Sequence, residues 1–389
     1  MATYRTGDRR RHVRQLGVAI LALAIVSGGF AWLWSTFRGE EGVPAGPQAA
    51  TDPDLLVPPG TIPRPNPVDP VLPDPRGKIA FVNRGDIWLI DPDGTGTQER
   101  LTEGMSASAP AWSPDGTRIA FAHEGGIYTI NADGTDSIQL TDPGAADLDL
   151  EPGEEGVLRQ FDVSPSWSPD GTRIAFVSQV QLGGREGGHI PYVMNADGSE
   201  LRRIQRLTRI QGNAEPRSAG PNSAETHLSW SPDGSEVVFW AYTDPPSRDG
   251  WYAWYAMEVE SGEAQAMVAP PLPPSWSVEE GNPPVFSPDG TTIAFSAYHC
   301  RPRGPCDGSE IFVMNAVGSG LKRLTRHPAA AYSPSWSPDG TRIAFQSSGG
   351  KNSRIYVMNA DGSEPARVTY RTRFPGGSSS PAWSPVSRS

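Results

Sequence analysis

Short apolar runs of β-forming residues recur along the chain from Lys78 onward, and turns rich in Gly, Pro, Asn and Asp separate them. The clearest marker is the string W-S-P-D-G or a variant of it, which begins at Trp112, Trp167, Trp230, Phe286, Trp336 and Trp383. The intervals between these positions run from 47 to 63 residues. Self-similarity at such a period indicates a repeat architecture built from small β units.

Each repeat predicts four strands, the first of which ends in P-x-W-S. The second strand reads I-A-F or close to it, at Ile79–Phe81, Ile119–Phe121, Ile174–Phe176, Val237–Phe239, Ile293–Phe295 and Ile343–Phe345. The third resembles I-Y-V-M-N, at Ile87–Asp91, Ile127–Asn131, Pro191–Asn195, Tyr255–Val259, Ile311–Asn315 and Ile355–Asn359. The fourth resembles R-L-T and ends at Thr102, Thr141, Thr208, Val268, Thr325 and Thr369. The connecting S-P-D-G and N-A-D-G turns suit type I geometry.

The two ends of the repeat region complement each other. The unit that starts at Lys78 lacks a P-x-W-S strand, and the segment Ser379–Ser384 is such a strand with no partner after it. Joining them predicts an all-β ring of six blades, closed by one C-terminal strand and three N-terminal strands. Closure removes the open sheet edge that would favour aggregation. We therefore expect a chain without residues 379–389 to be insoluble or molten.

This series of motifs resembles the propeller of TolB and its WD40-like relatives over about residues 78–385. The resemblance implies a six-bladed β-propeller. TolB carries a small α/β domain before its propeller, and residues 1–77 do not resemble one, so the TolB partnership with the lipoprotein Pal is not carried over. A similar propeller precedes the hydrolase domain of prolyl oligopeptidases, but this chain has no G-x-S-x-G nucleophile motif.

The N-terminal segment predicts an anchor. A basic tail at residues 1–15 precedes an uncharged apolar run at residues 16–37, which is long enough for a membrane-spanning helix. The positive flank should stay in the cytoplasm, so the rest lies outside. A cleaved signal peptide is the alternative. Residues 38–77 are rich in proline and predict an extended linker to the propeller at residues 78–389.

Charge and cysteine content narrow the partners and the compartment. The net charge is −11 although the first fourteen residues carry five Arg and one Asp, so the remainder is strongly acidic and nucleic acid is not expected as a partner. The only cysteines are Cys300 and Cys306, which have no zinc-type spacing. In an exported domain they predict a local disulfide.

The strand order predicts that all S-P-D-G and N-A-D-G turns share one face and that the irregular loops share the other. These loops are Asp142–Phe161, Val180–His189, Arg209–Thr226, Thr243–Gly250, Ala269–Gly281, Tyr298–Ser309 and Arg371–Ser378. Because variable loops on a rigid scaffold carry function, this face is the expected binding surface. The candidate residues on or beside it are His123, His189, His227, His299, His327, Asp147, Asp149, Glu151, Trp251 and Trp254.

Each of these groups has a second interpretation. The acidic stretch could hold calcium or a basic partner, but a solvated loop explains it as well. The aromatic stretch that contains Trp251 and Trp254 could line a sugar- or proline-binding patch or pack in the core. Oligogalacturonate lyases use similar propellers and hold a metal with several His at the centre, but no metal-binding His spacing occurs here.

The sequence therefore favours an envelope binding or scaffold protein that uses the loop-rich face to hold a protein, a peptide or a cell-wall component. No catalytic residue, metal ligand or cofactor is expected. A metal-dependent polysaccharide lyase or hydrolase with a His site at the channel mouth is one alternative. A small-ligand sensor is another.

Overall fold

The computed structural model describes residues 77–142, 157–182, 185–204, 216–217, 227–243, 251–278, 282–300, 306–326, 330–349, 352–369 and 378–385. Contacts divide the chain into two units, residues 1–60 and 61–389. The predicted basic tail and membrane helix, and the predicted linker apart from Gly77, lie outside the described residues. Among the residues that are described, no helix is long and apolar enough to cross a membrane.

The described residues form six antiparallel sheets, which we call blades 1 to 6. Blade 1 contains β26 (Ser378–Trp383), β1 (Ile79–Asn83), β2 (Asp86–Ile90) and β3 (Glu99–Arg100), and blade 2 contains β4 (Ser108–Trp112), β5 (Arg118–His123), β6 (Gly126–Asn131) and β7 (Ile138–Gln139). Blade 3 contains β8 (Val157–Trp167), β9 (Arg173–Leu182), β10 (Arg185–Asn195) and β11 (Arg202–Arg203). Blade 4 contains β12 (Pro216–Arg217), β13 (Leu228–Trp230), β14 (Glu236–Thr243), β15 (Trp251–Glu258) and β16 (Ala264–Ala266). Blade 5 contains β17 (Trp276–Val278), β18 (Val285–Phe286), β19 (Thr292–Cys300), β20 (Cys306–Asn315) and β21 (Lys322–Arg323). Blade 6 contains β22 (Ala330–Trp336), β23 (Arg342–Gly349), β24 (Asn352–Asn359) and β25 (Ala366–Arg367).

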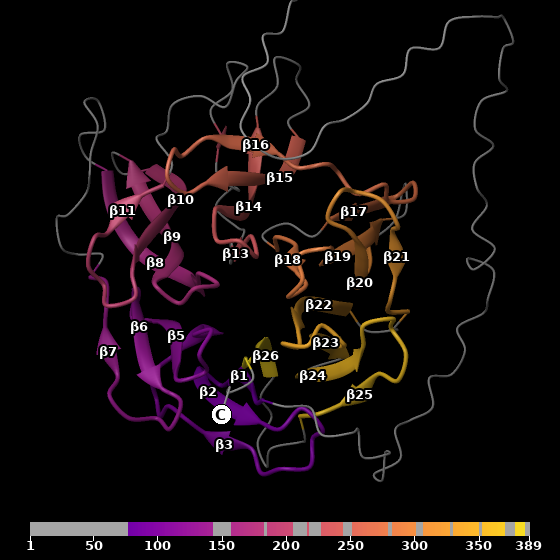
Figure 1. Ribbon diagram of the computed structural model, residues 1–389, viewed down its shortest axis with the longest axis horizontal. Coiled ribbons are helices and arrows are strands. Elements are labelled where there is room, and N and C mark those ends of the chain that lie inside the picture. The colour runs from indigo at the N-terminus through magenta and orange to yellow at the C-terminus, as the bar shows by residue number, and fades with distance from the viewer. Residues whose placement is uncertain are drawn as a thin grey trace, which may run out of the picture. The chain divides into compact units, whose positions relative to one another are not determined.

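The blades stand around a common centre, with their innermost strands facing it (Figure 1). These innermost strands contact one another in the order β26, β4, β8, β13, β18 and β22, and β22 contacts β26 again. The part of the chain that the structure describes contains no helix. The predicted all-β six-bladed propeller is therefore confirmed.

The apolar core lies between the blades and is supplied mainly by the second strands. The aromatic residue of the I-A-F motif is buried in every blade, at Phe81, Phe121, Phe176, Phe239, Phe295 and Phe345. Strand residues point alternately to the two faces of a sheet, and both faces of each blade meet a neighbouring blade. This explains why the second strands read as continuous apolar runs, such as residues 79–82 of the buried strand β1.

Two expectations about strand positions were wrong. The fourth strand of blade 3 is β11 and ends at Arg203, not at Thr208. Ile204 donates its backbone N–H to the carbonyl of Pro191 at 3.1 Å, as Leu101 does to Ile87 in blade 1 at 2.9 Å. Counting from the N-A-D-G turn, rather than matching the letters R-L-T, gives the correct strand.

The second correction concerns the expected loop Val180–His189. Most of it is an extension of the hairpin formed by β9 and β10, with Gln179 paired to His189. Blade 3 therefore has the longest strands of the ring, at 10 and 11 residues for this pair. The expected loop Tyr298–Ser309 likewise lies partly within β19 and β20.

The S-P-D-G turns are held by their own side chains. In blade 4, the hydroxyl of Ser231 donates to Asp233 Oδ1 at 2.6 Å and the backbone N–H of Ser235 donates to the same oxygen at 3.1 Å. Similar bonds occur at Asp170 in blade 3 and at Asp289 in blade 5. The serine hydroxyl and the backbone N–H stabilise the charged carboxylates, so the pKa values of these aspartates lie below the ordinary value of 3.8.

Acid should therefore destabilise the propeller. A lowered pKa in the folded state contributes stability that is fully present above the unfolded pKa and is lost as pH falls through the folded pKa. We expect the melting temperature to fall as pH drops below about 4. The variant Asp233→Asn should show a lower melting temperature at neutral pH and a shallower decline in acid. A variant with the same acid dependence as the wild type, measured by circular dichroism melting from pH 2 to 7, would contradict this role.

Candidate binding site at the centre of the ring

Four of the six innermost strands share an irregularity three residues before the motif Trp. Ala109, Ser164, Ser333 and Ser380 have positive φ angles, from 47° to 55°, and a proline follows each of them. The pairing of β4, β8, β22 and β26 with the second strands shifts register at the same place. A β-bulge leaves its extra residue unpaired and re-aims the strand. In four blades, the residue at this position of the repeat is thus left out of the strand pairing.

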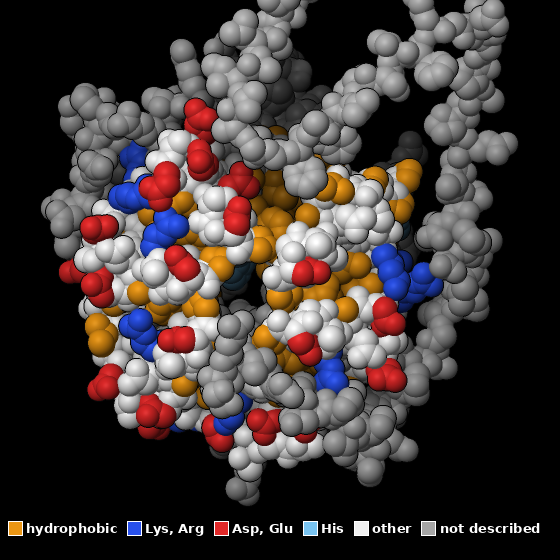
Figure 2. Space-filling view, in the orientation of Figure 1, with side chains coloured by type: hydrophobic (Ala, Val, Ile, Leu, Met, Phe, Trp, Pro, Cys, Tyr) orange, Lys and Arg blue, Asp and Glu red, His pale blue; other side chains and the backbone are white. Residues whose placement is uncertain are grey.

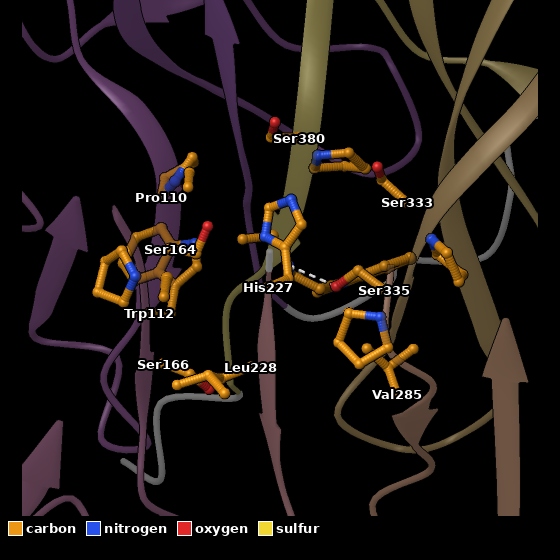
Figure 3. Close-up of a pocket in the computed structure, with 18 of the residues that line it drawn as sticks. Pro110, Trp112, Ser164, Ser166, His227, Leu228, Val285, Ser333, Ser335 and Ser380 are labelled. Atoms are coloured by element: carbon orange, nitrogen blue, oxygen red, sulfur yellow. Dashed lines mark hydrogen bonds between the residues drawn. The ribbon is translucent and has the colours of Figure 1, made fainter. Parts of the chain in front are cut away.

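These bulges surround a cavity of about 270 Å³ at the centre of the ring (Figure 3). Its lining comes from the innermost segment of every blade, that is, from the innermost strands and the residues next to them. It consists mainly of proline, serine, alanine and motif tryptophan side chains. Among the described residues that line it, none is Asp, Glu, Lys or Arg, and His227 is the one imidazole. The described lining thus offers no carboxylate, ammonium or guanidinium group.

Several polar side chains line the cavity, among them His227, Ser164 and Ser335. His227 points into its middle, and the hydroxyl of Ser164 points toward it from blade 3 (Figure 3). Ser164 is only 3% exposed, and its Oγ has no hydrogen-bond partner among the described residues. Ser335 Oγ accepts the backbone N–H of Trp383 at 3.1 Å. A buried hydroxyl without a partner is costly, so Ser164 favours an occupant with hydrogen-bonding groups.

Blades 4 and 5 interrupt the pattern of the other four. In each of these blades two short strands replace the single innermost strand. They are β12 and β13 in blade 4, and β17 and β18 in blade 5. The innermost segment is therefore longer in blade 5 than in blade 6. Between equivalent partners on the second strand, it runs from Val278 to Val285 in blade 5 but only from Ala331 to Ser335 in blade 6. His227 and Asn282 line the cavity from these two insertions. In sequence, these two blades differ from the others at the P-x-W motif. It is replaced by H-L-S-W in blade 4 and by N-P-P-V-F in blade 5.

Of the three predicted histidines whose side chains the structure describes, only His227 lines the central cavity. His123 ends β5, where its ring lies 5.0 Å from Tyr128 and its Nε2 lies 3.8 Å from Glu124. His299 pairs across the sheet with Trp276, with ring centroids 5.3 Å apart. Neither lines the central cavity. His189 lies in β10, and His327 lies outside the described residues. Only His227 has a described side chain at the channel.

The other candidate residues separate in the same way. Trp254 is 3% exposed and packs edge-on against Phe295 at 5.0 Å, which agrees with the core-packing interpretation of the aromatic stretch. Trp251 begins β15 opposite Thr243. The acidic residues Asp147, Asp149 and Glu151 lie outside the described residues.

Two predictions about covalent and metal chemistry remain predictions. Cys300 and Cys306 are direct partners across β19 and β20. Cα atoms of opposed residues in an antiparallel pair lie within the range that a disulfide spans, so the register is compatible with the predicted bridge. Within the described residues, no group of three or more His, Cys, Asp or Glu is placed to hold a metal ion.

Comparison with known proteins agrees with the repeat pattern. The family described as the TolB beta propeller domain matches residues 275–389, and the N-terminal region of dipeptidyl peptidase IV matches residues 83–200. A segment of 103 residues is 31% identical to the uncharacterized peptidase YuxL of Bacillus subtilis, covering 26% of this chain and 15% of that protein. A segment of 56 residues is 39% identical to the Tol-Pal system protein TolB of Thioalkalivibrio sulfidiphilus, covering 14% of this chain and 13% of that protein.

The chain thus spans less than a sixth of the length of these curated relatives. The crystal structure of TolB from Acinetobacter baumannii superposes with a TM-score of 0.55 at 20% identity, and the match covers 81% of this chain and 68% of that one. At this identity the likeness concerns the fold. Together with the six repeats and the ring of six sheets, these matches support a β-propeller of the TolB type.

Proposed function

We propose that the protein is a binding module of the cell envelope, which holds an extended segment of a partner protein or peptide at the centre of its propeller. The observation that carries the proposal is the central cavity, whose described lining comes from all six blades and contains no Asp, Glu, Lys or Arg. Such a site exists only when the ring is complete, so the rigid fold and the site depend on each other. The predicted anchor and linker would present this site outside the cytoplasm.

The lining suits a peptide chain. Proline rings and the indoles of Trp112, Trp167 and Trp383 offer apolar contact, while the Ser164 hydroxyl and the His227 imidazole offer hydrogen bonds to a peptide backbone. Concave, mostly apolar sites with a few directed polar groups are typical of ligand binding. His227 and Asn282, at the ends of the insertions in blades 4 and 5, line the cavity, so they would help to distinguish one segment from another.

A plug in the cavity should abolish this binding. We expect peptides selected from a random display library by the wild-type chain to bind the His227→Trp variant at least ~10-fold more weakly, because an indole fills space that the peptide needs. Fluorescence anisotropy of the labelled peptides measures the affinities. His227→Ala should weaken binding less, since it removes a hydrogen-bonding group without blocking the cavity.

The matched control is His123→Ala, which removes a histidine that does not line the cavity. It should leave the affinities unchanged. Failure of the wild-type chain to select any peptide, or equal binding by His227→Trp and the wild type, would overturn the central site.

A further inference from the structure

Among the described residues, an arginine covers the motif tryptophan of the next blade at the junction of blades 2 and 3 and at the junction of blades 3 and 4. The arginine is the residue directly before the I-A-F motif. The guanidinium carbon of Arg118 lies 5.1 Å from the centre of the Trp167 ring, and that of Arg173 lies 5.2 Å from the Trp230 ring. The two indoles are 7% and 6% exposed. This distance allows a cation–π interaction, so the arginine both seals the ring junction and stabilises it.

The junction of blades 3 and 4 shows what such an arginine binds. Arg173 donates from Nη1 to Glu260 Oε1 at 2.7 Å and from Nη2 to the carbonyl of Gly234 at 3.2 Å. A second cation, Arg202, donates to Glu260 Oε2 at 3.1 Å and to the carbonyl of Val259 at 2.8 Å. The site therefore consists of an aromatic face, the carbonyl of the S-P-D-G glycine and a carboxylate on the turn after the third strand. It tolerates two cations.

The junction of blades 5 and 6 has the same parts but lacks the arginine. Thr292 stands at the position of Arg173, and a cavity of about 540 Å³ opens beside it. Its lining includes the Trp336 ring, Gly340 and Asp361, which correspond to Trp230, Gly234 and Glu260. Trp336 is only half-buried, unlike the two covered indoles.

The second cation is also present at this junction. Lys322 donates to the backbone carbonyl of Asp361 at 2.8 Å, which parallels the bond between Arg202 and Val259. Lys322 thus occupies the position of the neighbouring cation and leaves the place above Trp336 open.

The charge around this cavity favours a cation. Its lining carries the carboxylates of Asp289, Asp339 and Asp361 and a single ammonium group, that of Lys322. Acidic side chains are also spread over the face of the ring shown in Figure 2, and the whole chain has a net charge of −11. A basic partner would therefore be attracted toward the ring before it docks.

We propose that the cavity between blades 5 and 6 binds the guanidinium group of an arginine side chain presented by a basic segment of a partner protein. The guanidinium stacks on Trp336 and donates to the Asp361 carboxylate and the Gly340 carbonyl. Arginine fits better than lysine because its planar group stacks while it donates in two directions. This site does not depend on the central cavity.

Ligand-observed NMR on the full chain tests the proposal with a pair of blocked tripeptides, Gly-Arg-Gly and Gly-citrulline-Gly. Citrulline keeps the shape of arginine and removes its charge. We expect the arginine peptide to bind at least ~10-fold more tightly. Equal binding of the two peptides, or equal binding of a Gly-Lys-Gly peptide, would overturn the proposal.

Variants locate the binding. Asp361→Asn should weaken it ~5-fold or more. The matched control is Asp197→Asn, which removes the corresponding carboxylate in blade 3, where Arg118 already covers the tryptophan. Both aspartates accept the same pair of bonds from a serine two residues later, so any effect on the turn is equal. Equal loss in the two variants would overturn the location.

The variant Thr292→Arg fills the site from within the chain. It should abolish binding of the arginine peptide and raise the melting temperature, because it restores the contact that Arg173 makes in blade 4. Unchanged peptide binding by a folded Thr292→Arg variant would show that the peptide binds elsewhere and would refute the site.

Discussion

A chain that lacks residues 379–389 should fail to form a soluble native ring. Ser378–Trp383 form β26, the innermost strand of blade 1, so the deletion removes the partner of β1. Trp383 is 7% exposed and packs with Ile79 and Phe81, so those apolar side chains would lose their cover. The unpaired edge of β1 would then be open to other chains. We expect the truncated chain to appear in the insoluble fraction, or to lose its near-ultraviolet circular dichroism if it stays soluble.

The ends of the chain are also joined beyond the strand pair. Ser384 donates its backbone N–H to the carbonyl of Lys78 at 2.8 Å, and its hydroxyl accepts the Lys78 N–H at 2.7 Å. The control is therefore a shorter deletion of residues 386–389, which leaves these bonds in place and should fold like the full chain. A chain without residues 379–389 that melts at the same temperature as this control would refute the joining of the two ends.

The second and third strands could be predicted from sequence because burial on both faces produces a local signal. Ile119–Phe121 and its equivalents in the other blades are apolar at every position, and a turn with its own hydrogen-bonding side chains follows each strand pair. The fourth strands are only two or three residues long and mostly exposed, so no apolar period marks them. The error at Thr208 arose because the letters R-L-T occur at residues 206–208, three to five residues after the end of the true strand.

The central site could be predicted only in part. The P-x-W-S motif located the innermost strands, but nothing in it reveals that Ser164 and its equivalents adopt a left-handed backbone and leave the ladder. Five histidines seemed equivalent in sequence because all of them fall in or beside irregular loops. His227 differs from the others by standing three residues before a motif tryptophan, which is the position that faces the cavity in the regular blades.

Departures from the repeat carried more functional information than the repeat itself. H-L-S-W and N-P-P-V-F mark the two insertions beside the central cavity, and Thr292 marks the open site above Trp336. In a molecule built from similar units, the regular units show which contact each position normally makes. A unit that omits such a contact leaves a defined space, and the chemistry around that space indicates what could fill it.

The threonine of the R-L-T motif has one structural role in several blades. Thr102, Thr141, Thr325 and Thr369 each accept a backbone N–H from the third strand of their own blade at 2.9–3.0 Å. In blade 5 the hydroxyl of Thr325 also donates to the carboxylate of Glu310, which is 4% exposed. Arg323 donates to the same carboxylate at 3.0 Å. The hydroxyl thus joins the exposed fourth strand to a buried charge.

Replacement of Thr325 by valine should therefore lower the free energy of unfolding by about 2–3 kcal/mol. Valine keeps the shape of threonine but leaves the buried N–H of Ile311 without its acceptor and removes one partner from the Glu310 carboxylate. Threonine to serine keeps the hydroxyl and loses a methyl group, so Thr325→Ser should cost about 1 kcal/mol or less. Urea denaturation of the two variants separates hydrogen bonding from packing. If valine and serine destabilise the propeller equally, the hydroxyl bonds contribute nothing measurable to stability. The R-L-T threonine would then not act as a link between a strand and a buried carboxylate.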